Sequence, residues 1–323
     1  MTKKNYYIII SLILACIFIV LGVFVYQTNA ISGSIDVTLI VKSQQQGFEF
    51  WELLKKGAQE GAKEFNVKLS VDGAMSEVDV AGQIKVMEQA IAKKPDAIIL
   101  AAADSEALLP YAKQAKEQGI KLILVDSALE EKAEDCFVGT NNYEAANSVG
   151  NAMAHRMGDV GKIAVISHAT QTATAQQRFA GFERAVRNYP DIEIVGTYDI
   201  GDSTEKSYET TLNVLRENPD ITGIYATNQI SAEGVTLALK ELKKDVTFFA
   251  FDSSIVQNEA LENDIVDGFA VQMPFNMGYL AVTSAVDACA GKLRKTDVDT
   301  GFAFATKENM RQEAIQKLIY PFV

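Results

Sequence analysis

The chain is poor in the residues that build disulfide frameworks and metal sites. Its 323 residues include three cysteines and two histidines. Cys16 lies in an apolar leader, so only Cys136 and Cys289 remain in the part that follows, and a chain of this length needs no disulfide framework. We predict that both are small buried hydrophobes, with a single bridge between them as the alternative. His155 and His168 show no pattern of ligands at zinc-binding spacing, so no metal site is expected.

Positive charge and catalytic motifs are also scarce. Lysine and arginine number 30 against 42 acidic residues, which gives a net charge of −12 and a pI of about 4.8. Such a chain repels nucleic acid and anionic lipid headgroups, so DNA binding has no electrostatic basis. The sequence has no Ser–His–Asp arrangement, no Gly-x-Ser-x-Gly, no Walker A loop and no Gly-x-Gly-x-x-Gly after its first predicted strand. We therefore predict that the protein is not an enzyme, binds no nucleic acid and needs no cofactor.

Charge is absent altogether from one long stretch near the N-terminus. Lys3 and Lys4 precede Tyr6 to Tyr26, which contains no charged residue. About 20 apolar residues can cross a membrane as a helix, and the two lysines should stay on the cytoplasmic side. Residues 1–30 are therefore interpreted as a signal anchor or signal peptide. Everything from about Ile31 onward should lie on the extracellular face of the cell membrane.

Three fates of this leader remain open. Cleavage after Thr28-Asn29-Ala30 is one, although the apolar stretch exceeds the usual signal-peptide core of about 7–15 residues. Acylation of Cys16 is another, because Ile13-Leu14-Ala15-Cys16 resembles a lipobox; apolar residues 17–26, however, follow it in place of a polar tether. The length of the stretch favours the third fate, a helix that stays in the membrane as an anchor.

After the leader, short β-branched runs alternate with longer stretches that have apolar residues at helical spacing. Predicted strands span residues 36–41, 68–71, 97–101, 121–125, 162–166, 193–197, 223–226, 247–251 and 268–271. Predicted helices span residues 50–65, 77–93, 105–118, 143–156, 174–189, 204–217, 232–242 and 276–290. Apolar strands that alternate with helices indicate parallel sheets buried on both faces. Nine predicted strands are too many for one small open sheet. We therefore predict an α/β fold with two doubly wound parallel sheets.

Ligands of doubly wound sheets bind beyond the carboxyl ends of the strands. In this chain the residues that follow the predicted strands include amides, carboxylates and an arginine. The first strand is followed by three glutamines (44–46) and by Trp51, the only tryptophan. Aspartate accepts bonds from adjacent hydroxyls, asparagine and glutamine donate and accept, and arginine donates a fixed fork. A flat aromatic face covers the C–H face of a pyranose ring. This set of side chains suits a neutral polyol better than a nucleophilic reaction.

Eight stretches occur in the order and at the separations typical of one protein family. They are LIVKSQQQGFEFWELLKKGAQEGAKE, KKPDAIILAAADSEAL, GIKLILVDS, VGTNN, TATAQQRFAGF, IYATNQISAEGV, FFAFDSS and VQMPFNMGYLAV. From about Ile35 onward the chain resembles the type I periplasmic or extracellular solute-binding proteins of the ribose-binding group. Lac-repressor-type regulators share that fold in their ligand domain. The first and last stretches look most like sugar-binding members from Gram-positive bacteria.

The resemblance implies two lobes joined by a three-strand hinge. Residues 35–139 and 273–297 would form the N-terminal lobe, and residues 140–272 and 298–323 the C-terminal lobe. The implied crossovers lie near Cys136–Asn141, Val271–Met273 and Asp297–Gly301.

The resemblance also implies a ligand-binding set. The stacking aromatics would be Phe50 and Trp51, the polar ligands Asp126, Arg178, Asn228, Asp252 and Gln272, and the extra contacts of this branch Lys42 and Gln46. Ser127 stands where the ribose binder has an arginine, and Asp202 falls near the position of a stacking aromatic. About two extra residues also precede Phe50. The sugar therefore need not be ribose.

Most of these residues also have a structural alternative. Trp51 would then be a core residue, Asp126, Asn228 and Asp252 helix caps, Arg178 a solvated helix residue, Gln272 a hinge residue and Lys42 a strand-end charge. The functional hypothesis is a membrane-tethered extracellular protein that binds a monosaccharide and presents it to an ABC permease. The alternative is a co-sensor for a membrane histidine kinase, which a retained helix and the short link 27–34 would suit. A transcriptional regulator of this fold would need a basic helix-turn-helix where this chain has the leader.

Overall fold

Two six-stranded sheets form the framework of the computed structural model, which describes residues 34–321. The first sheet contains β1 (Asp36–Val41), β2 (Lys68–Gly73), β3 (Ala97–Leu100), β4 (Lys121–Val125), β5 (Cys136–Gly139) and β11 (Asp297–Asp299). Its order is β11-β5-β4-β3-β1-β2, and all neighbouring strands are parallel. The predicted leader lies outside the described residues. Among those described, no helix combines the length and apolar character needed to cross a membrane.

The second sheet repeats this plan. It contains β6 (Val160–Ser167), β7 (Asp191–Asp199), β8 (Gly223–Ala226), β9 (Thr247–Phe251), β10 (Gly268–Val271) and β12 (Ala303–Thr306). Its order is β12-β10-β9-β8-β6-β7, and β12 alone runs antiparallel to its neighbour, β10. Parallel strands put their carboxyl ends at one edge, so each sheet gathers its βα loops at a single edge.

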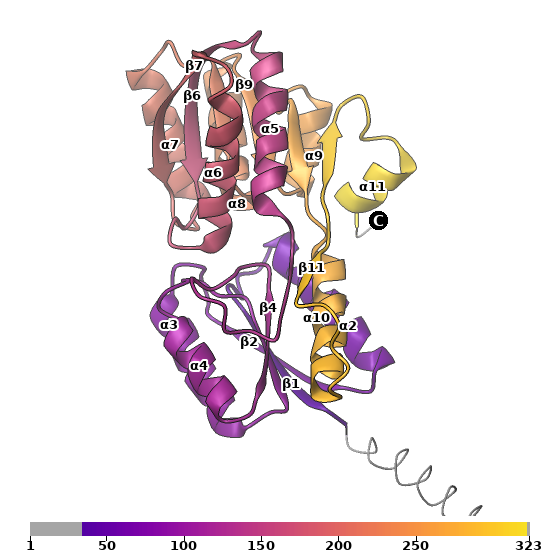
Figure 1. Ribbon diagram of the computed structural model, residues 1–323. Coiled ribbons are helices and arrows are strands. Elements are labelled where there is room, and N and C mark those ends of the chain that lie inside the picture. Colours follow the sequence, from indigo (N-terminus) through magenta and orange to yellow (C-terminus); the bar gives the residue numbers. More distant parts are fainter. Residues whose placement is uncertain (1–33, 322–323) are drawn as a thin grey trace, which may run out of the picture. The chain divides into compact units, whose positions relative to one another are not determined.

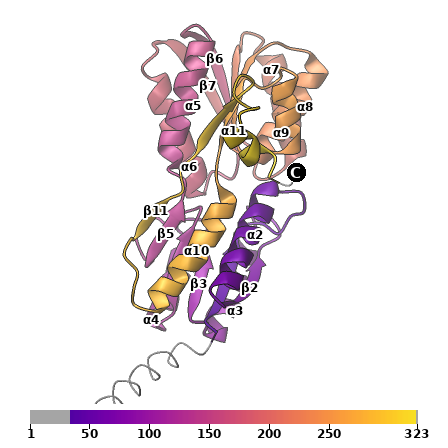
Figure 2. The ribbon, with the colours of Figure 1, turned by 90° about the vertical axis from the view of Figure 1, so that its right-hand side faces the viewer.

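Helices cover both faces of each sheet. The first sheet carries α2 (Glu49–Glu64), α3 (Val80–Lys93), α4 (Leu109–Glu117) and α10 (Pro274–Cys289). The second carries α5 (Asn142–Arg156), α6 (Ala173–Val186), α7 (Thr204–Glu217), α8 (Gln229–Leu242), α9 (Ile255–Glu262) and α11 (Glu313–Ile319). In the first lobe, α2 and α10 lie side by side on one face and α3 and α4 on the other (Figures 1 and 2). In the second lobe, α5 packs beside α6 and α7 beside α8.

Each sheet is buried because its strands are apolar on both faces. In the first lobe, Ile98 and Leu100 of β3 pack against Met87 and Ile91 of α3, and these four side chains are almost fully buried. Ile99, between the two β3 residues, points to the opposite face, as alternation along a strand requires. Full burial on both sides is the condition under which a parallel sheet is stable. The predicted α/β fold with two parallel-sheet lobes is confirmed.

The chain passes between the two sheets three times. It crosses after β5, again between β10 and α10, and a third time between β11 and β12. As a result α10 packs in the first lobe although it follows a strand of the second (Figure 2). These crossings lie in the segments that the resemblance assigns to a hinge.

The structure corrects several predicted helix starts, among them that of the helix expected from residue 232, which begins at Gln229. The helix expected from Glu77 begins at Val80, because the Asp79 side chain accepts a hydrogen bond from Gly82 N and caps the helix there. The helix expected from Ser105 begins at Leu109, after a turn in which the Asp104 carboxylate binds backbone N–H groups. The short strands β5, β11 and β12 and the helices α9 and α11 were not predicted.

Close packing of α2 on α10 depends on two glycines. A Cβ atom on Gly57 would lie 1.9 Å from the carbonyl oxygen of Phe275, and one on Gly278 would lie 2.0 Å from that of Leu54. Neither neighbour is a flexible side-chain end, so backbone would have to move. Trp51 lies in the first turn of α2 and Gln272 lies two residues before α10, so the spacing of the two helices also sets part of the pocket described below.

We predict that Gly57→Ala lowers the free energy of unfolding by about 1–3 kcal/mol, because the added methyl group overpacks the α2–α10 contact. Urea denaturation measures the change. Glu60→Ala, on the exposed side of the same helix, is the control and should change stability by no more than about 0.5 kcal/mol. Equal stability of the two variants would contradict the tight contact.

Candidate functional site

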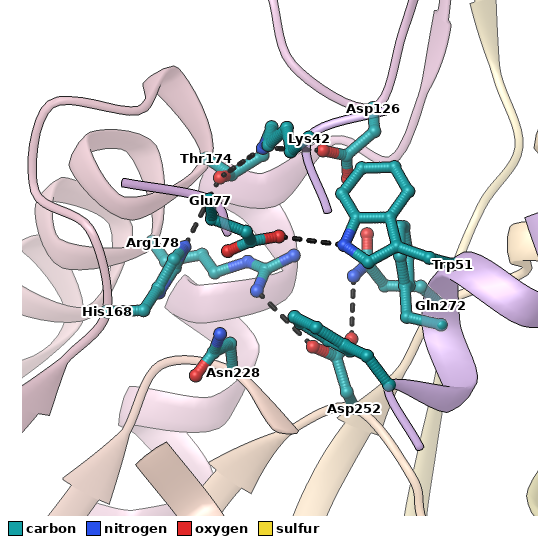
Figure 3. A pocket seen from close by; sticks show the side chains of 12 residues that line it. Lys42, Trp51, Glu77, Asp126, His168, Thr174, Arg178, Asn228, Asp252 and Gln272 are labelled. Atoms are coloured by element: carbon teal, nitrogen blue, oxygen red, sulfur yellow. Dashed lines mark hydrogen bonds and ion pairs between the residues drawn. The ribbon is translucent and has the colours of Figure 1, made fainter. Parts of the chain in front are cut away.

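Side chains from both lobes meet in a pocket at the carboxyl ends of the strands (Figure 3). It is lined by Lys42, Phe48, Phe50, Trp51, Glu77 and Asp126 of the first lobe, by His168, Thr174, Arg178, Asn228 and Asp252 of the second, and by Gln272 at the crossing after β10. About 240 Å³ of space, open solvent included, lies among these side chains. The lobes are therefore close together around the pocket.

The pocket contains eight of the nine predicted ligand residues; Gln46 is missing from its lining. Gln46 lies in the turn between β1 and α2, and its side chain is exposed. The turn continues through Gly47, whose φ of +82° is the left-handed conformation that glycine adopts most easily. The following residues return to the interior, and Phe48 and Phe50 are buried.

The aromatic wall of the pocket comes from the first lobe. The Phe50 and Trp51 rings meet edge to face with centroids 4.9 Å apart, and Phe48 approaches Trp51 at 6.3 Å in a similar geometry. Trp51 is 1% exposed, and its indole N–H donates to Glu77 Oε1 at 2.9 Å. A buried tryptophan usually needs such a partner. The bond fixes the indole against the pocket, so Trp51 both packs in the core and lines the site.

Each lobe buries one cation beside one carboxylate. In the first lobe, Lys42 Nζ lies 2.7 Å from Asp126 Oδ2. In the second, Arg178 lies 3.6 Å from Asp252 Oδ2. All four side chains are less than 8% exposed. An unpaired charge at such depth would be strongly destabilising, so pairing is what allows these groups to line a closed pocket.

The two aspartates occupy equivalent places in the two lobes. Asp126 directly follows β4, and Asp252 directly follows β9, each at the point where its strand ends. Both have positive φ values, 63° and 67°, in the left-handed region that aspartate tolerates better than most residues. This conformation ends the strand and turns the carboxylate toward the pocket (Figure 3). Neither aspartate is the N-cap of the following helix, so the capping alternative does not hold for them.

Arg178 is fixed from several sides. Its Nε donates to Asn142 Oδ1 at 2.8 Å, its NH1 donates to the Thr227 carbonyl oxygen at 2.7 Å, and its guanidinium lies 4.2 Å from the centre of the Phe251 ring. The side chain is 2% exposed, so it is not a solvated helix residue. An arginine held this firmly presents its remaining N–H groups in a fixed direction.

Asn228 and Gln272 each combine a structural and a pocket-facing role. Asn228 caps α8, since its side-chain oxygen accepts from Ser231 N at 2.9 Å, while the residue still lines the pocket. Gln272 Nε2 donates to Asp252 Oδ1 at 2.6 Å. Its Oε1 is buried without a hydrogen-bond partner among the described residues. That oxygen can accept a bond from a ligand hydroxyl.

Four lining residues were not predicted: Phe48, Glu77, His168 and Thr174. Glu77 was missed because its segment was expected to be helical, whereas it lies in the β2–α3 loop. His168 directly follows β6, so a search of every strand end would have found it.

Burial shifts the pKa of three titratable groups in the pocket. It raises the pKa of Glu77 to about 7, although Lys42 and the Trp51 hydrogen bond partly oppose the rise. Burial also raises the pKa of Asp252, against the influence of Arg178. The pKa of His168 is held well below its usual value by burial and then by Arg178 and Lys42. His168 is therefore neutral, and its ring nitrogens lie 2.7 Å from Thr227 Oγ1 and 3.3 Å from Thr174 Oγ1.

A family model described as a periplasmic binding protein domain matches residues 37–293. The chain belongs to this family. A D-ribose/D-allose-binding protein of Pseudomonas aeruginosa is 27% identical over 273 residues, which cover 81% of this chain and 85% of the relative. Together with ribose import binding proteins, it places the chain in the ribose-binding-like sugar-binding group of type I members, so the resemblance seen in the sequence is confirmed.

Solved structures of family members superpose on most of the chain. One is a carbohydrate transporter solute-binding protein from Agrobacterium radiobacter in complex with D-arabinose, with a TM-score of 0.85, 28% identity, and coverage of 89% of this chain and 99% of that one. Another is an ABC transporter solute-binding protein from Agrobacterium vitis with bound D-fucose, with a TM-score of 0.85, 27% identity, and coverage of 88% and 100%. These relatives are binding proteins of transport systems, which fits the expectation of a non-enzymatic role.

Glu77 should make stability depend on pH. Because its pKa rises from 4.5 to about 7 on folding, the folded protein keeps a proton that the unfolded chain has released. This contribution is fully present below about pH 4.5 and is lost as the pH rises to about 7. We predict that the wild type loses up to about 3 kcal/mol relative to Glu77→Gln over this interval. Urea denaturation at several pH values tests this, and a pH-independent difference would contradict it.

Proposed function

We propose that this chain is an extracellular sugar-binding protein whose two lobes close on a monosaccharide. The observation that carries the proposal is the pocket itself, where hydrogen-bonding groups from both lobes surround a small space beside an aromatic wall. Lys42 and Arg178 are each neutralised by a carboxylate. A pocket with its cations already paired has no free site for a phosphate or carboxylate ligand. Amides, carboxylates and a guanidinium in fixed positions suit the hydroxyl groups of a neutral sugar.

The lobes also touch directly in the closed arrangement of the structure. Lys42 Nζ lies 3.4 Å from Thr174 Oγ1, and the N–H of Glu77 donates to Asp202 Oδ2 at 2.9 Å. The Gln229 side chain donates to the Gly47 carbonyl oxygen at 3.2 Å. These few polar contacts are weak individually. A sugar that bonds to both lobes would add to them and shift the population toward closure, with the three crossings acting as the hinge.

In the proposed role, the closed form delivers the sugar to an ABC permease. The names of the relatives support import, since several are import or transporter binding proteins. The apolar leader, residues 1–30, would hold the protein at the extracellular face of the membrane.

A second role is favoured by the leader. The apolar stretch continues for ten residues beyond Cys16, to Tyr26. A retained membrane helix would hold the sugar-binding part close to a neighbouring receptor, as a co-sensor for a membrane histidine kinase requires. Import is the first proposal because the relatives are transport proteins.

The stacking wall gives a test of the pocket. Replacing Trp51 by alanine should weaken sugar binding by at least about 1–2 kcal/mol, because buried aromatic area is lost. Isothermal calorimetry measures the change, with the sugar first identified by a thermal-shift screen of pentoses, hexoses and polyols, since a ligand of the folded state raises the melting temperature. Phe65→Ala, at the far end of α2, is the control.

Trp51→Phe keeps an aromatic ring in the wall but loses the hydrogen bond to Glu77. It therefore separates the effect of stacking on sugar binding from the effect of that bond on folding. Unchanged affinity in a folded Trp51→Ala variant would remove Trp51 from the site. The absence of a thermal shift with every sugar of the panel would count against the proposed function.

Mass spectrometry of the full-length protein from membranes tests the anchor. We expect the mass of the intact chain, with Cys16 unmodified, because the residues after it are apolar rather than polar. A diacylglyceryl group on Cys16 would contradict the retained helix and favour import. A shorter chain that begins at Ile31 would show cleavage.

A further inference from the structure

Glu77 is the carboxylate of the pocket that lacks a cation of its own. Lys42 and Arg178 are committed to Asp126 and Asp252, and within residues 34–321 no cation lies at ion-pair distance from Glu77. The residue is 4% exposed and lines the pocket. A structural carboxylate with no ionic partner is costly at such depth.

The carboxyl group is held in place from both ends of the residue. Trp51 Nε1 donates to its Oε1 at 2.9 Å, and its backbone N–H donates to Asp202 Oδ2 of the second lobe at 2.9 Å. Asp202 is the residue that falls near the position of a stacking aromatic in the ribose binder. A carboxylate has about four acceptor positions, and the indole uses one. Figure 3 shows the Glu77 carboxyl group between Trp51 and Arg178, directed into the pocket.

We propose that Glu77 is a specificity-determining ligand contact, which accepts a hydrogen bond from a hydroxyl group of the bound sugar. The proposal rests on the sugar-binding function proposed above. The residue is fixed before the ligand arrives, so the contact selects a donor at one position of the ring. A sugar without a donor there would leave a buried carboxyl group unsatisfied, which is the strongest form of discrimination that a polar pocket provides.

The surroundings of Glu77 couple this contact to pH. The charged and titratable groups that face it are Lys42 at the end of β1, Asp126 after β4, Asp202 before α7, and Arg178 with neutral His168 on the second lobe. In the ligand-free pocket, burial favours the protonated acid. A ligand donor favours the carboxylate instead, so binding lowers the pKa of Glu77 and releases a proton near neutral pH.

The sole tryptophan of the chain reports on this event. Because Trp51 donates to Glu77, its fluorescence should change as Glu77 ionises. We expect a transition with a midpoint near pH 7 in the ligand-free wild type and none in Glu77→Gln. D-ribose, D-allose, D-arabinose and D-fucose are the first probes. The sugar that binds should move the midpoint downward and should bind more tightly at pH 8 than at pH 5. If the bound sugar lowers the midpoint by one pH unit, its affinity should be almost tenfold higher at pH 8 than at pH 5.

Glu60→Gln, on the exposed side of α2, is the matched control and should keep both the transition and the pH dependence. In Glu77→Gln the affinity should not vary with pH. A bound sugar that leaves the midpoint unchanged, or raises it, would overturn the contact while sugar binding stands. The same holds if the wild-type affinity is independent of pH. Failure of every probe to bind would instead count against the proposed function and against this inference with it.

Discussion

The pairing of charges buried between the two lobes is the constraint on which the site depends. A closed pocket removes its lining from water, so each charge in it needs a partner at close range. This chain meets the requirement separately in each lobe, with Lys42 beside Asp126 and Arg178 beside Asp252. Because each pair lies within one lobe, the lobes can part without leaving a charge unpaired.

The fold supplies this arrangement through the geometry of parallel strands. The carboxyl ends of β4 and β9 face the same space from opposite lobes, and an aspartate in left-handed conformation follows each strand. The strands themselves are apolar and buried, so polar groups are concentrated where the strands end. A repeated local structure thus gives two similar half-sites. The aromatic wall differs between the halves, because Phe48, Phe50 and Trp51 all belong to the first lobe.

Much of the framework could be predicted because it depends on local patterns. Short buried strands, such as residues 121–125 and 223–226, have the bounds expected from the sequence. The strands β11 and β12 were not predicted because strands of three or four residues carry little periodicity, and their place is set by the returning chain. Eight of the nine ligand residues that the resemblance implies line the pocket. Gln46 is not among the lining residues, since its side chain is exposed in the turn around Gly47, a property of backbone geometry rather than composition.

Glu77 shows why the remaining part of the site was hidden. Its segment, Ser76 to Asp79, has the composition of a helix start, and only the Asp79 cap fixes the helix three residues later. The loop that results carries Glu77 to the pocket and its backbone N–H to Asp202 on the other lobe. Asp202 lies near the position at which the ribose binder has a stacking aromatic. Its carboxylate accepts a hydrogen bond from the first lobe. The second lobe therefore contributes a polar closing contact through Asp202, whereas the aromatic rings Phe48, Phe50 and Trp51 that line the pocket belong to the first lobe.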